Sequence, residues 1–416
     1  MKIGCYPLHH GTVAAVRSLG RLGVPVYAVA DGRFAPVALS RYLTGRFHWP
    51  TTGAESAGEL LAGLRGIGAR LGRPAVALAT DDEAAVLLAA HRTGLADLFL
   101  LPPVDPALPG LLADKQGLYS LCRAHGVPTP ESALATSADS LRDAVARFGL
   151  PVVVKNPAPW RRLCAPVVSG TTVLRDRDES AVLERALERS PGSRLLVQEY
   201  LPDPAGSGRV ADWFTHVYCY ADAGPPLVFT GMKLSSWPPG GGVTARGVTA
   251  AHPSLAAETA EFCRAIGYRG IADLDWRYDG RTGRLALVDF NPRVGAQFQL
   301  FRSTAGIDVV RAQYLDLTGR AAPEGVQVDA RELVVEHLAA AAALEGRLHH
   351  RARPPHPRPE RREGAWFAWD DPLPFAAATA RFSAVALRRV VRVGAVSGDA
   401  APREAEPEQW SATTEP

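Results

Sequence analysis

Residues 287–295 read LVDFNPRVG, and this stretch decides the fold because it places Asp289, Asn291 and Arg293 at alternate positions of an otherwise apolar run. In a β-strand, residues two apart point to the same face, so the three polar side chains are predicted to share one face. The asparagine stands out, since the chain contains only Asn156 and Asn291. A carboxylate, an amide and a guanidinium in one row indicate a strand that builds a binding site.

The segment before it, GIADLDWRYD at 270–279, has the same alternation and places Asp273 and Asp275 on one face. A short turn joins the two segments, so they are predicted to pair and to bring Asp275 close to Asp289 and Asn291. Two carboxylates and an amide oxygen form a hard, oxygen-only ligand set that suits Mg²⁺. Each acid alone is also typical of a solvated sheet residue, but their combination favours a metal site.

Lysine is the second informative residue type, because only four of the 46 basic residues are lysine: Lys2, Lys115, Lys155 and Lys233. Where arginine serves as the general positive charge, a retained lysine indicates a need for a compact ammonium group. The alternative is that the interior lysines are chance survivors of this composition.

Three of these lysines lie where separate segments could meet. Lys155 ends the apolar strand PVVVK, and a buried cation is costly unless an anion binds there; alternatively, its stem is buried and its head reaches solvent. Lys115 lies early in a predicted helix, and Lys233 precedes the glycine-rich segment PPGGG at 238–242. The three positions predict a site for nucleotide phosphates.

The chain divides into regions of different pattern. Residues 1–110 alternate short apolar strands with helical segments, which predicts a parallel, doubly wound sheet. Its turns near HHG and TDDE face the carboxyl ends of the strands, where such sheets bind ligands. Residues 111–320 predict an α+β unit in which most strands, from 212 to 292, form an antiparallel sheet.

The C-terminal region is predicted to be helical. In residues 321–395 we expect one alanine-rich helix over 331–348, a basic proline-rich linker over 349–364 and a basic apolar helix over 375–394. That last helix could pack on the body of the protein or lie on a membrane surface or a partner. Residues 396–416 are polar and are expected to be a disordered tail.

Bulk composition narrows the functional class. A length of 416 residues predicts two or three packed units. The chain shows neither a signal-peptide pattern nor an apolar stretch of transmembrane length, and its five unpaired cysteines indicate reduced thiols. We therefore expect a cytoplasmic enzyme. The net charge of +3 with scattered arginines does not indicate a nucleic-acid partner.

The order of these motifs resembles the ATP-grasp superfamily over roughly residues 111–320. The motifs are DK followed by GVPTP, PVVVK, VQEYL, a lysine before a glycine loop, DLDW and DFNPR. Residues 1–110 resemble the pre-ATP-grasp domain, and VRSLGRLGVPVYAV with LSRY is similar to the bacterial ATP-dependent carboxylate–amine ligase branch. The resemblance implies an α/β and α+β fold: a doubly wound pre-ATP-grasp domain, a two-lobed ATP-grasp unit and a C-terminal extension.

The resemblance also implies roles for single residues. Lys115 and Lys155 would contact nucleotide phosphates, and Lys233 and Arg293 would act on the transferring phosphoryl group. The adenine would lie against a hinge, and its ribose would be bound by Asp212, chosen over Asp203. The hinge comprises Glu199, Tyr200 and Leu201. The metal ligands would be Asp275, Asp289 and Asn291.

The implied reaction is activation of a carboxylate as an acyl phosphate by ATP, with two Mg²⁺ ions or Mn²⁺ in their place, and transfer to an amine of an amino-acid-like substrate. Other ATP-grasp reactions, namely carboxylation and phosphoryl transfer, stay open, as do a non-catalytic nucleotide-binding role and a homodimer. Arg246 and Arg302 could bind a substrate carboxylate or lie at the surface. Two features depart from the pattern: Asp289 stands where relatives usually have glutamate, and the loop after Lys155 is bulky.

Overall fold

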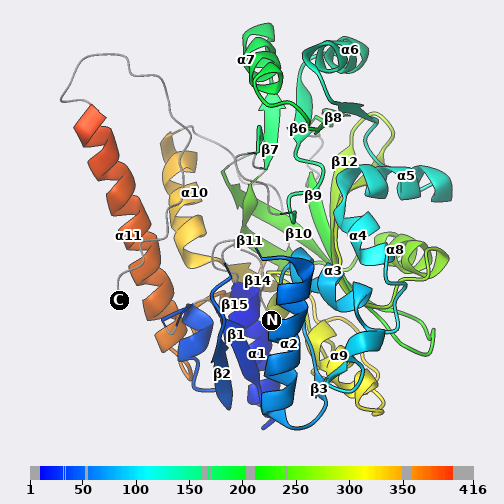
Figure 1. Ribbon diagram of the computed structural model, residues 1–416, viewed down its shortest axis with the longest axis vertical. Helices are drawn as coiled ribbons and strands as arrows, with labels where there is room; N and C mark the ends of the chain where they lie inside the picture. The colour runs from blue at the N-terminus through cyan, green and yellow to red at the C-terminus, as the bar shows by residue number, and fades with distance from the viewer. Residues whose placement is uncertain are drawn as a thin grey trace.

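The structure is a computed structural model that describes residues 10–30, 32, 34–51, 55–161, 166–168, 170–202, 211–238, 242–348 and 358–396. The predicted strand at 2–6, most of the linker and the tail from 397 lie outside these ranges. A large twisted sheet occupies the centre, a smaller lobe stands above it, and the N-terminal unit packs below it (Figure 1). Among the described helices, none combines the length and the apolar character needed to cross a membrane.

The central sheet has seven strands in the order β13-β12-β9-β10-β11-β14-β15. All neighbours pair antiparallel except β14 and β15, which are parallel. The bounds are β9 Asp212–Cys219, β10 Leu227–Trp237, β11 Val243–Thr249, β12 Gly270–Asp279, β13 Arg284–Asn291, β14 Arg331–Val334 and β15 Arg361–Gly364. The four strands predicted between 212 and 292 are confirmed, and β11 is an addition in a segment that we expected to be a loop.

The two faces of this sheet are covered differently. Large apolar side chains such as Trp276 and Phe290 point to one face, where they pack against helix α8 (Pro253–Ala265) and helix α5 (Lys115–His125). The opposite face packs its aromatic residues against helix α1 (His10–Gly20), the 3₁₀ turn η3 (Phe298–Leu300) and helix α9 (Val309–Leu317). The same face carries Asp275 and Asp289 further along the strands.

The smaller lobe is a four-stranded antiparallel sheet in the order β5-β8-β6-β7. Its strands are β5 Ser132–Ala135, β6 Val152–Lys155, β7 Thr171–Leu174 and β8 Leu195–Glu199. Helices α6 (Ala138–Phe148) and α7 (Arg177–Glu188) pack on it through their leucine-rich faces. The two sheets form the two lobes that the resemblance implies.

The N-terminal unit consists of two parallel strand pairs and the helices between them. β1 (Tyr27–Ala30) pairs with β2 (Gly45–His48), and β3 (Ala75–Val76) pairs with β4 (Phe99–Leu100). The helices are α1, α2 Ala57–Leu71, α3 Asp82–Ala90 and α4 Leu108–Ala113, with 3₁₀ turns η1 Pro36–Leu39 and η2 Thr93–Leu95. The parallel pairing agrees with the predicted strand–helix alternation, although β3 is shorter than predicted.

The C-terminal region corrects two predictions. The helix expected over 331–348 begins only at Glu336 (α10, Glu336–Leu348), because residues 331–334 form β14. The end of the expected linker forms β15, and helix α11 spans Leu373–Val396. Both strands are hydrogen-bonded into the central sheet, so the chain returns to the main body after residue 330.

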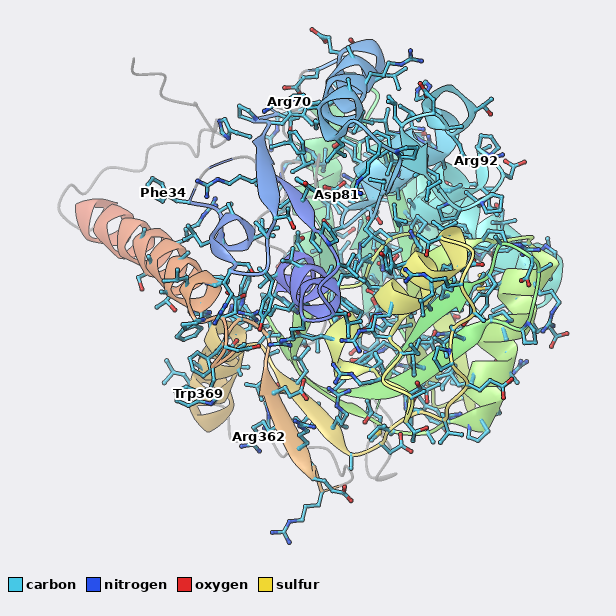
Figure 2. All side chains as sticks on the ribbon, turned by 90° about the horizontal axis from the view of Figure 1, so that it is seen from below. Phe34, Arg70, Asp81, Arg92, Arg362 and Trp369 are labelled. Atoms are coloured by element: carbon cyan, nitrogen blue, oxygen red, sulfur yellow. The ribbon has the colours of Figure 1, made fainter. Side chains whose placement is uncertain are left out.

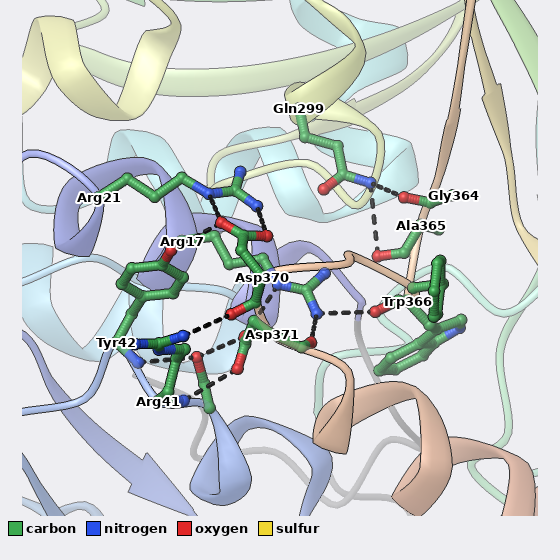
Figure 3. Close-up of polar contacts among 12 residues, drawn as sticks. Arg17, Arg21, Arg41, Tyr42, Gln299, Gly364, Ala365, Trp366, Asp370 and Asp371 are labelled. Atoms are coloured by element: carbon green, nitrogen blue, oxygen red, sulfur yellow. Dashed lines mark hydrogen bonds and ion pairs between the residues drawn. The ribbon is translucent and has the colours of Figure 1, made fainter.

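A buried ion pair fastens this returning segment to α1 (Figure 3). Arg17 Nε lies 3.0 Å from Asp371 Oδ2, and Arg17 Nη2 donates to the carbonyls of Trp366 and Asp371 at 2.8 and 2.7 Å. Ser40 and the Arg41 amide also donate to the Asp371 carboxylate. The segment runs from buried Trp366 to Trp369, which is 91% exposed at the periphery of the molecule (Figure 2).

Candidate active site

The β12–β13 ladder brings the two predicted metal-binding carboxylates together. Asp275 lies directly opposite Asp289, and Asp273 lies directly opposite Asn291. Directly opposed residues of an antiparallel pair share a face, as the alternation predicted. The register then slips at Val288, which has no opposite residue. Because of this bulge, Leu287 points into the apolar core, whereas Asp289 points to the opposite face of the sheet together with Asp275, here called the site face.

Lys115 is placed by a break that the sequence did not suggest. The helix expected to run through Lys115 is split at Asp114, whose side chain caps α5 by accepting from the Gln116 and Gly117 amides at 3.0 Å. Lys115 is therefore the first residue of α5, and it forms an ion pair with Asp289. Burial would raise the pKa of Asp289, but Lys115 and Lys155 together hold it below its usual range.

Lys155 lies at the end of β6, at the joint between the lobes. Its Nζ donates to the Val288 carbonyl at 3.2 Å, the residue that the register skips. Burial lowers the pKa of Lys155 to about 8, with Lys115 adding to the effect and Asp289 opposing it. A buried ammonium with a lowered pKa gains most from an incoming anion.

Lys233 reaches the same cluster from β10. Its Nζ lies 3.4 Å from Asp275 Oδ1. Burial alone would lower the pKa of Lys233, but Asp275 and Asp212 raise it above its ordinary value, so the side chain stays protonated. The three predicted lysines thus converge on the Asp275 and Asp289 carboxylates and the Val288 carbonyl.

Arg293 is held by two carboxylates that the sequence pattern did not assign to the site. β13 ends at Asn291, so Arg293 lies in the following turn rather than on the strand, and its amide donates to the Asn291 carbonyl at 2.8 Å. Its guanidinium still reaches the site face, with Nη1 3.1 Å from Asp273 Oδ2 and Nε 3.6 Å from Asp82 Oδ1. These two acids outweigh the effect of burial and raise the pKa of Arg293.

His216 and Gly295 complete the support of Arg293. His216 Nε2 lies 3.3 Å from Asp273 Oδ1, and burial lowers the pKa of this histidine to about 3, so its ring is neutral. A Cβ on Gly295 would lie 2.2 Å from the His216 ring and 2.7 Å from Asp273 Oδ2. The glycine therefore permits a contact that a larger residue would block. The TDDE turn at the carboxyl end of a strand was a signal from which Asp82 could have been predicted, whereas the sequence around His216 contains no comparable signal.

The donor set fits a hard divalent cation. The Asp275 and Asp289 side chains are 31% and 27% exposed, whereas Asp273 on the same face is 7% exposed and engaged by Arg293. The described residues hold no cluster of three or more His, Cys, Asp or Glu side chains suited to a metal. A metal at Asp275 and Asp289 would therefore take its other oxygens from Asn291, water and nucleotide phosphates.

The predicted hinge follows β8 into the joint. The Glu199 carboxylate accepts from the Glu131 amide at 3.1 Å and pairs with Arg281 at 3.0 Å, and the Glu199 amide donates to the Glu131 carbonyl at 2.9 Å. Tyr200 lies under the Arg277 guanidinium, and Leu201 is buried with its carbonyl accepting from Arg277 at 2.9 Å.

Two other predicted ligand contacts have structural partners. Asp212, at the start of β9, pairs with Arg277 at 2.7 Å, and the alternative Asp203 lies outside the described residues. Arg246 pairs with fully buried Glu332 in the sheet. The pairing accounts for Arg246 as a structural residue and leaves Arg302 as the other candidate for a substrate carboxylate.

A small cavity of about 60 Å³ lies beside Arg293, between β3, α3 and the start of β12. Its walls are mainly small and apolar, with Arg293, Tyr268 and Arg269 as the larger polar residues. Of the predicted site residues only Arg293 lines this cavity, so the cavity adjoins Arg293 on the side of the N-terminal unit and is not the space between the lysines and the acids.

Comparison with known proteins gives distant relatives. No protein-family model matches the chain. A D-aspartate ligase from Enterococcus faecium (strain Aus0004) is 24% identical over 243 residues, 56% of each chain. The chain thus spans about half the length of this curated relative.

Solved structures match over more of the chain. N5-carboxyaminoimidazole synthetase from Staphylococcus aureus, complexed with ADP, superposes over 80% of each chain with a TM-score of 0.58 and 11% identity. The biotin carboxylase domain of Hydrogenobacter thermophilus 2-oxoglutarate carboxylase, in complex with MgADP, ADP and bicarbonate, has a TM-score of 0.55 and 14% identity; the match covers 77% of this chain and 70% of that one. At these identities the likeness concerns the fold.

Proposed function

We propose, from the premise that the chain has the ATP-grasp fold, that the protein is an ATP-dependent ligase that joins a carboxylate to an amine. The observation that carries this proposal is the convergence of Lys115, Lys155 and Lys233 on the Asp275–Asp289 pair. The curated relative is named a D-aspartate ligase, which supports an amino-acid-like substrate.

The chain's own residues suit the charge changes of such a reaction. A substrate carboxylate oxygen attacks the γ-phosphorus of ATP, forming an acyl phosphate and releasing ADP. An amine nitrogen then attacks the acyl carbon, forming the amide, losing a proton and expelling phosphate. Lys115 and Lys155 would bind the phosphates, and Lys233 and Arg293 would stabilise charge on the transferring phosphoryl group.

The contacts of Arg293 support the part proposed for it in this scheme. Asp82 and Asp273 hold its guanidinium from two sides, so its position is set before substrate arrives. Mg²⁺, which Asp275, Asp289 and Asn291 would hold, supplies Lewis-acid stabilisation of the phosphates when bound; use of Mn²⁺ instead stays a prediction. The segment 238–242 is a candidate lid against water, although residues 239–241 lie outside the described ranges.

A screen for ADP release over pairs of amino acids tests this function. We expect ADP to form only when both a carboxylate and an amine substrate are present, with a product whose mass equals the two substrates less one water. Hydroxylamine in place of the amine should give a hydroxamate. ADP release without any new amide would count against ligation.

Carboxylation is the second candidate, because the structural neighbours include a biotin carboxylase and N5-carboxyaminoimidazole synthetase. Both reactions use the same nucleotide site, so the discriminating observation is the co-substrate. Bicarbonate-dependent ADP release without an amino acid would favour carboxylation. ATP binding without turnover under any condition would instead favour a regulatory nucleotide-binding role. A homodimer also stays a proposal, which a measurement of molecular mass in solution would test.

A further inference from the structure

Two arginines near the active-site face carry buried donor atoms that have no hydrogen-bond partner. They are Nε of Arg302, and Nε and Nη1 of Arg331. The Arg331 side chain is only 6% exposed and spends a single nitrogen, Nη2, on Glu363 at 2.8 Å and on the Gln299 carbonyl at 3.4 Å. Buried guanidinium donors without acceptors are costly, and an anion bound here would supply the missing acceptors.

The backbone brings these two side chains to the same place. Residues 302 and 303 run beside 327 and 328, with the Val328 amide donating to the Arg302 carbonyl at 2.9 Å and Ser303 paired with Gln327. Arg331 begins the next strand, and its Nη2 reaches back to residue 299. The segments that carry Arg302 and Arg331 therefore lie side by side.

The neighbouring charges leave the pair with an excess of positive charge. Burial lowers the pKa of Arg302, and the guanidinium groups of Arg331 and Arg311 lower it further. The Asp308 and Glu363 carboxylates oppose this effect, but each less than the two arginines lower the pKa.

Both of these carboxylates already have other partners. Glu363 accepts from Arg331 and lies 3.5 Å from Arg361. Asp308 accepts from Ser18 at 2.6 Å and lies 3.6 Å from Arg311. Apart from the exposed Arg361, three guanidinium groups, those of Arg302, Arg311 and Arg331, thus share two carboxylates, and an anionic ligand would restore the balance.

Arg331 also shares the sheet face of the metal-type acids. Its amide donates to Thr249 Oγ1 at 2.9 Å, and Arg331 and Thr249 each lie one residue beyond the opposed pair Val248 and Glu332 of β11 and β14. Thr249 lies opposite Gly231, Gly231 lies opposite Phe214, and Phe214 lies opposite Asp275. Since opposed residues share a face, Arg331 and Asp275 lie on the same face of the sheet, four strands apart. An anion bound by Arg331 would therefore lie on the same side of the sheet as the reacting groups.

We propose that Arg302 and Arg331 bind a second carboxylate of the substrate, one that is not activated, so that the preferred substrate is an amino dicarboxylate. The inference rests on the proposed function, in which the first carboxylate is activated as an acyl phosphate. Arginine's planar fork suits a carboxylate held through two parallel hydrogen bonds. The unused donors of the pair, Nε of Arg302 and Nε and Nη1 of Arg331, are those that such a ligand would satisfy.

Equilibrium binding to the full-length protein tests this site without any turnover. The probes are the D and L forms of aspartate and glutamate, with alanine, β-alanine and γ-aminobutyrate as analogues that lack one carboxylate. At least one dicarboxylate should bind the wild type about 10- to 100-fold more tightly than its analogues, the difference expected for a hydrogen-bonded charge pair. In Arg302→Gln and Arg331→Gln that preference should be lost.

Arg361→Gln is the matched control, since Arg361 lies opposite Arg331 on β15 and also neighbours Glu363 but is 74% exposed. It should bind like the wild type, and thermal melting of each variant checks folding. Equal binding of dicarboxylates and analogues by the wild type, or an unchanged preference in folded Arg302→Gln, would overturn the inference. Arginine-dependent binding without ADP release in any substrate pair would instead retain this site and reject the proposed ligase.

Discussion

Asp275 and Asp289 face each other across a strand ladder, and each is neutralised by a lysine from a different part of the chain. Once the lysines bind nucleotide phosphates instead, the two carboxylates need a metal cation to offset their mutual repulsion. We expect Asp289→Asn to lower the rate of ADP release at least about 100-fold, as loss of a metal or phosphate contact does. Its melting temperature should stay near that of the wild type.

The control is Asp222→Asn, which removes an exposed carboxylate from a loop outside the site. That variant should keep full activity. Wild-type rates in Asp289→Asn would remove Asp289 from the metal site.

Lys155 predicts a pH dependence of nucleotide binding. Burial lowers its pKa to about 8 in the free protein, and bound phosphates would favour the protonated form and raise that pKa. Affinity for ATP should therefore be constant below pH 8 and fall by up to about tenfold per pH unit above it, until the pKa of the complex is reached. Isothermal titration between pH 6.5 and 9.5 measures this, and proton uptake on binding near pH 8 should accompany it.

Lys155→Arg provides the comparison for that experiment, because a guanidinium stays protonated throughout this range. The fall above pH 8 should be absent in this variant even if its affinity is lower. The same fall in Lys155→Arg would assign the titration to another group.

Asp82 is expected to act through Arg293 rather than on substrate. Asp82→Asn should lower kcat while leaving KM for ATP within about twofold, since the variant loosens the orientation of the guanidinium without removing its charge. Asp82 lies in the N-terminal unit, so the effect would also show that this unit helps to build the site. A parallel rise in KM for ATP with unchanged kcat would contradict a positioning role.

Single residues show how far the sequence could predict this site. The alternation of Asp275, Asp289 and Asn291 and the rarity of lysine both indicated the cluster, because each is a pattern visible within a short segment or in the composition. Asp82 and His216 were missed, since they join Arg293 only through packing of segments far apart in the chain. Arg293 was placed on a strand that ends two residues earlier.

The strands β10 and β11 depend on small residues at one crossing. Gly231 on β10 lies opposite Thr249 and Phe214, and a Cβ there would lie 2.9 Å from Phe214 and 3.0 Å from Phe301. Gly231→Ala should therefore cost about 1–3 kcal/mol of unfolding free energy by overpacking. Urea unfolding measures the change.

Gly280→Ala, in the β12–β13 turn where no atom lies within 4 Å of an added Cβ, is the control for that substitution. It should change stability by less than about 0.5 kcal/mol. Equal effects of the two substitutions would mean that the Phe214–Phe301 contact tolerates the extra methyl group.

The elements that were mispredicted share a physical cause. β11 reads VTARGVT beside a glycine-rich segment, so its composition resembles a loop. RELV of β14 runs directly into an alanine-rich helix, and RREG of β15 is almost entirely charged. These strands are fixed by pairing with the existing sheet rather than by their own propensity, which a local pattern does not reveal.

The whole molecule is closed by the Arg17–Asp371 pair between α1 and the segment before α11 (Figure 3). Both side chains are at most 4% exposed. Asp371→Asn would leave a buried guanidinium without its counter-ion, and we expect it to lower the free energy of unfolding by about 3–5 kcal/mol. Denaturant unfolding is the measurement.

The adjacent pair Arg21–Asp370 is the control, because its side chains are 38% and 43% exposed. Asp370→Asn should lower the free energy of unfolding by less than about 1 kcal/mol. Similar losses of unfolding free energy in the two variants would show that the burial of an ion pair does not determine how much it stabilises this contact.

The Arg17–Asp371 contact joins residues 354 positions apart in the chain. Contacts of such sequence separation form late, because a long loop must close before they gain anything. During synthesis, α1 and β11 must therefore wait for their partners in residues 331–371 to leave the ribosome. Until then the edge of β11 is an open strand edge, a surface on which chaperones or aggregation would act.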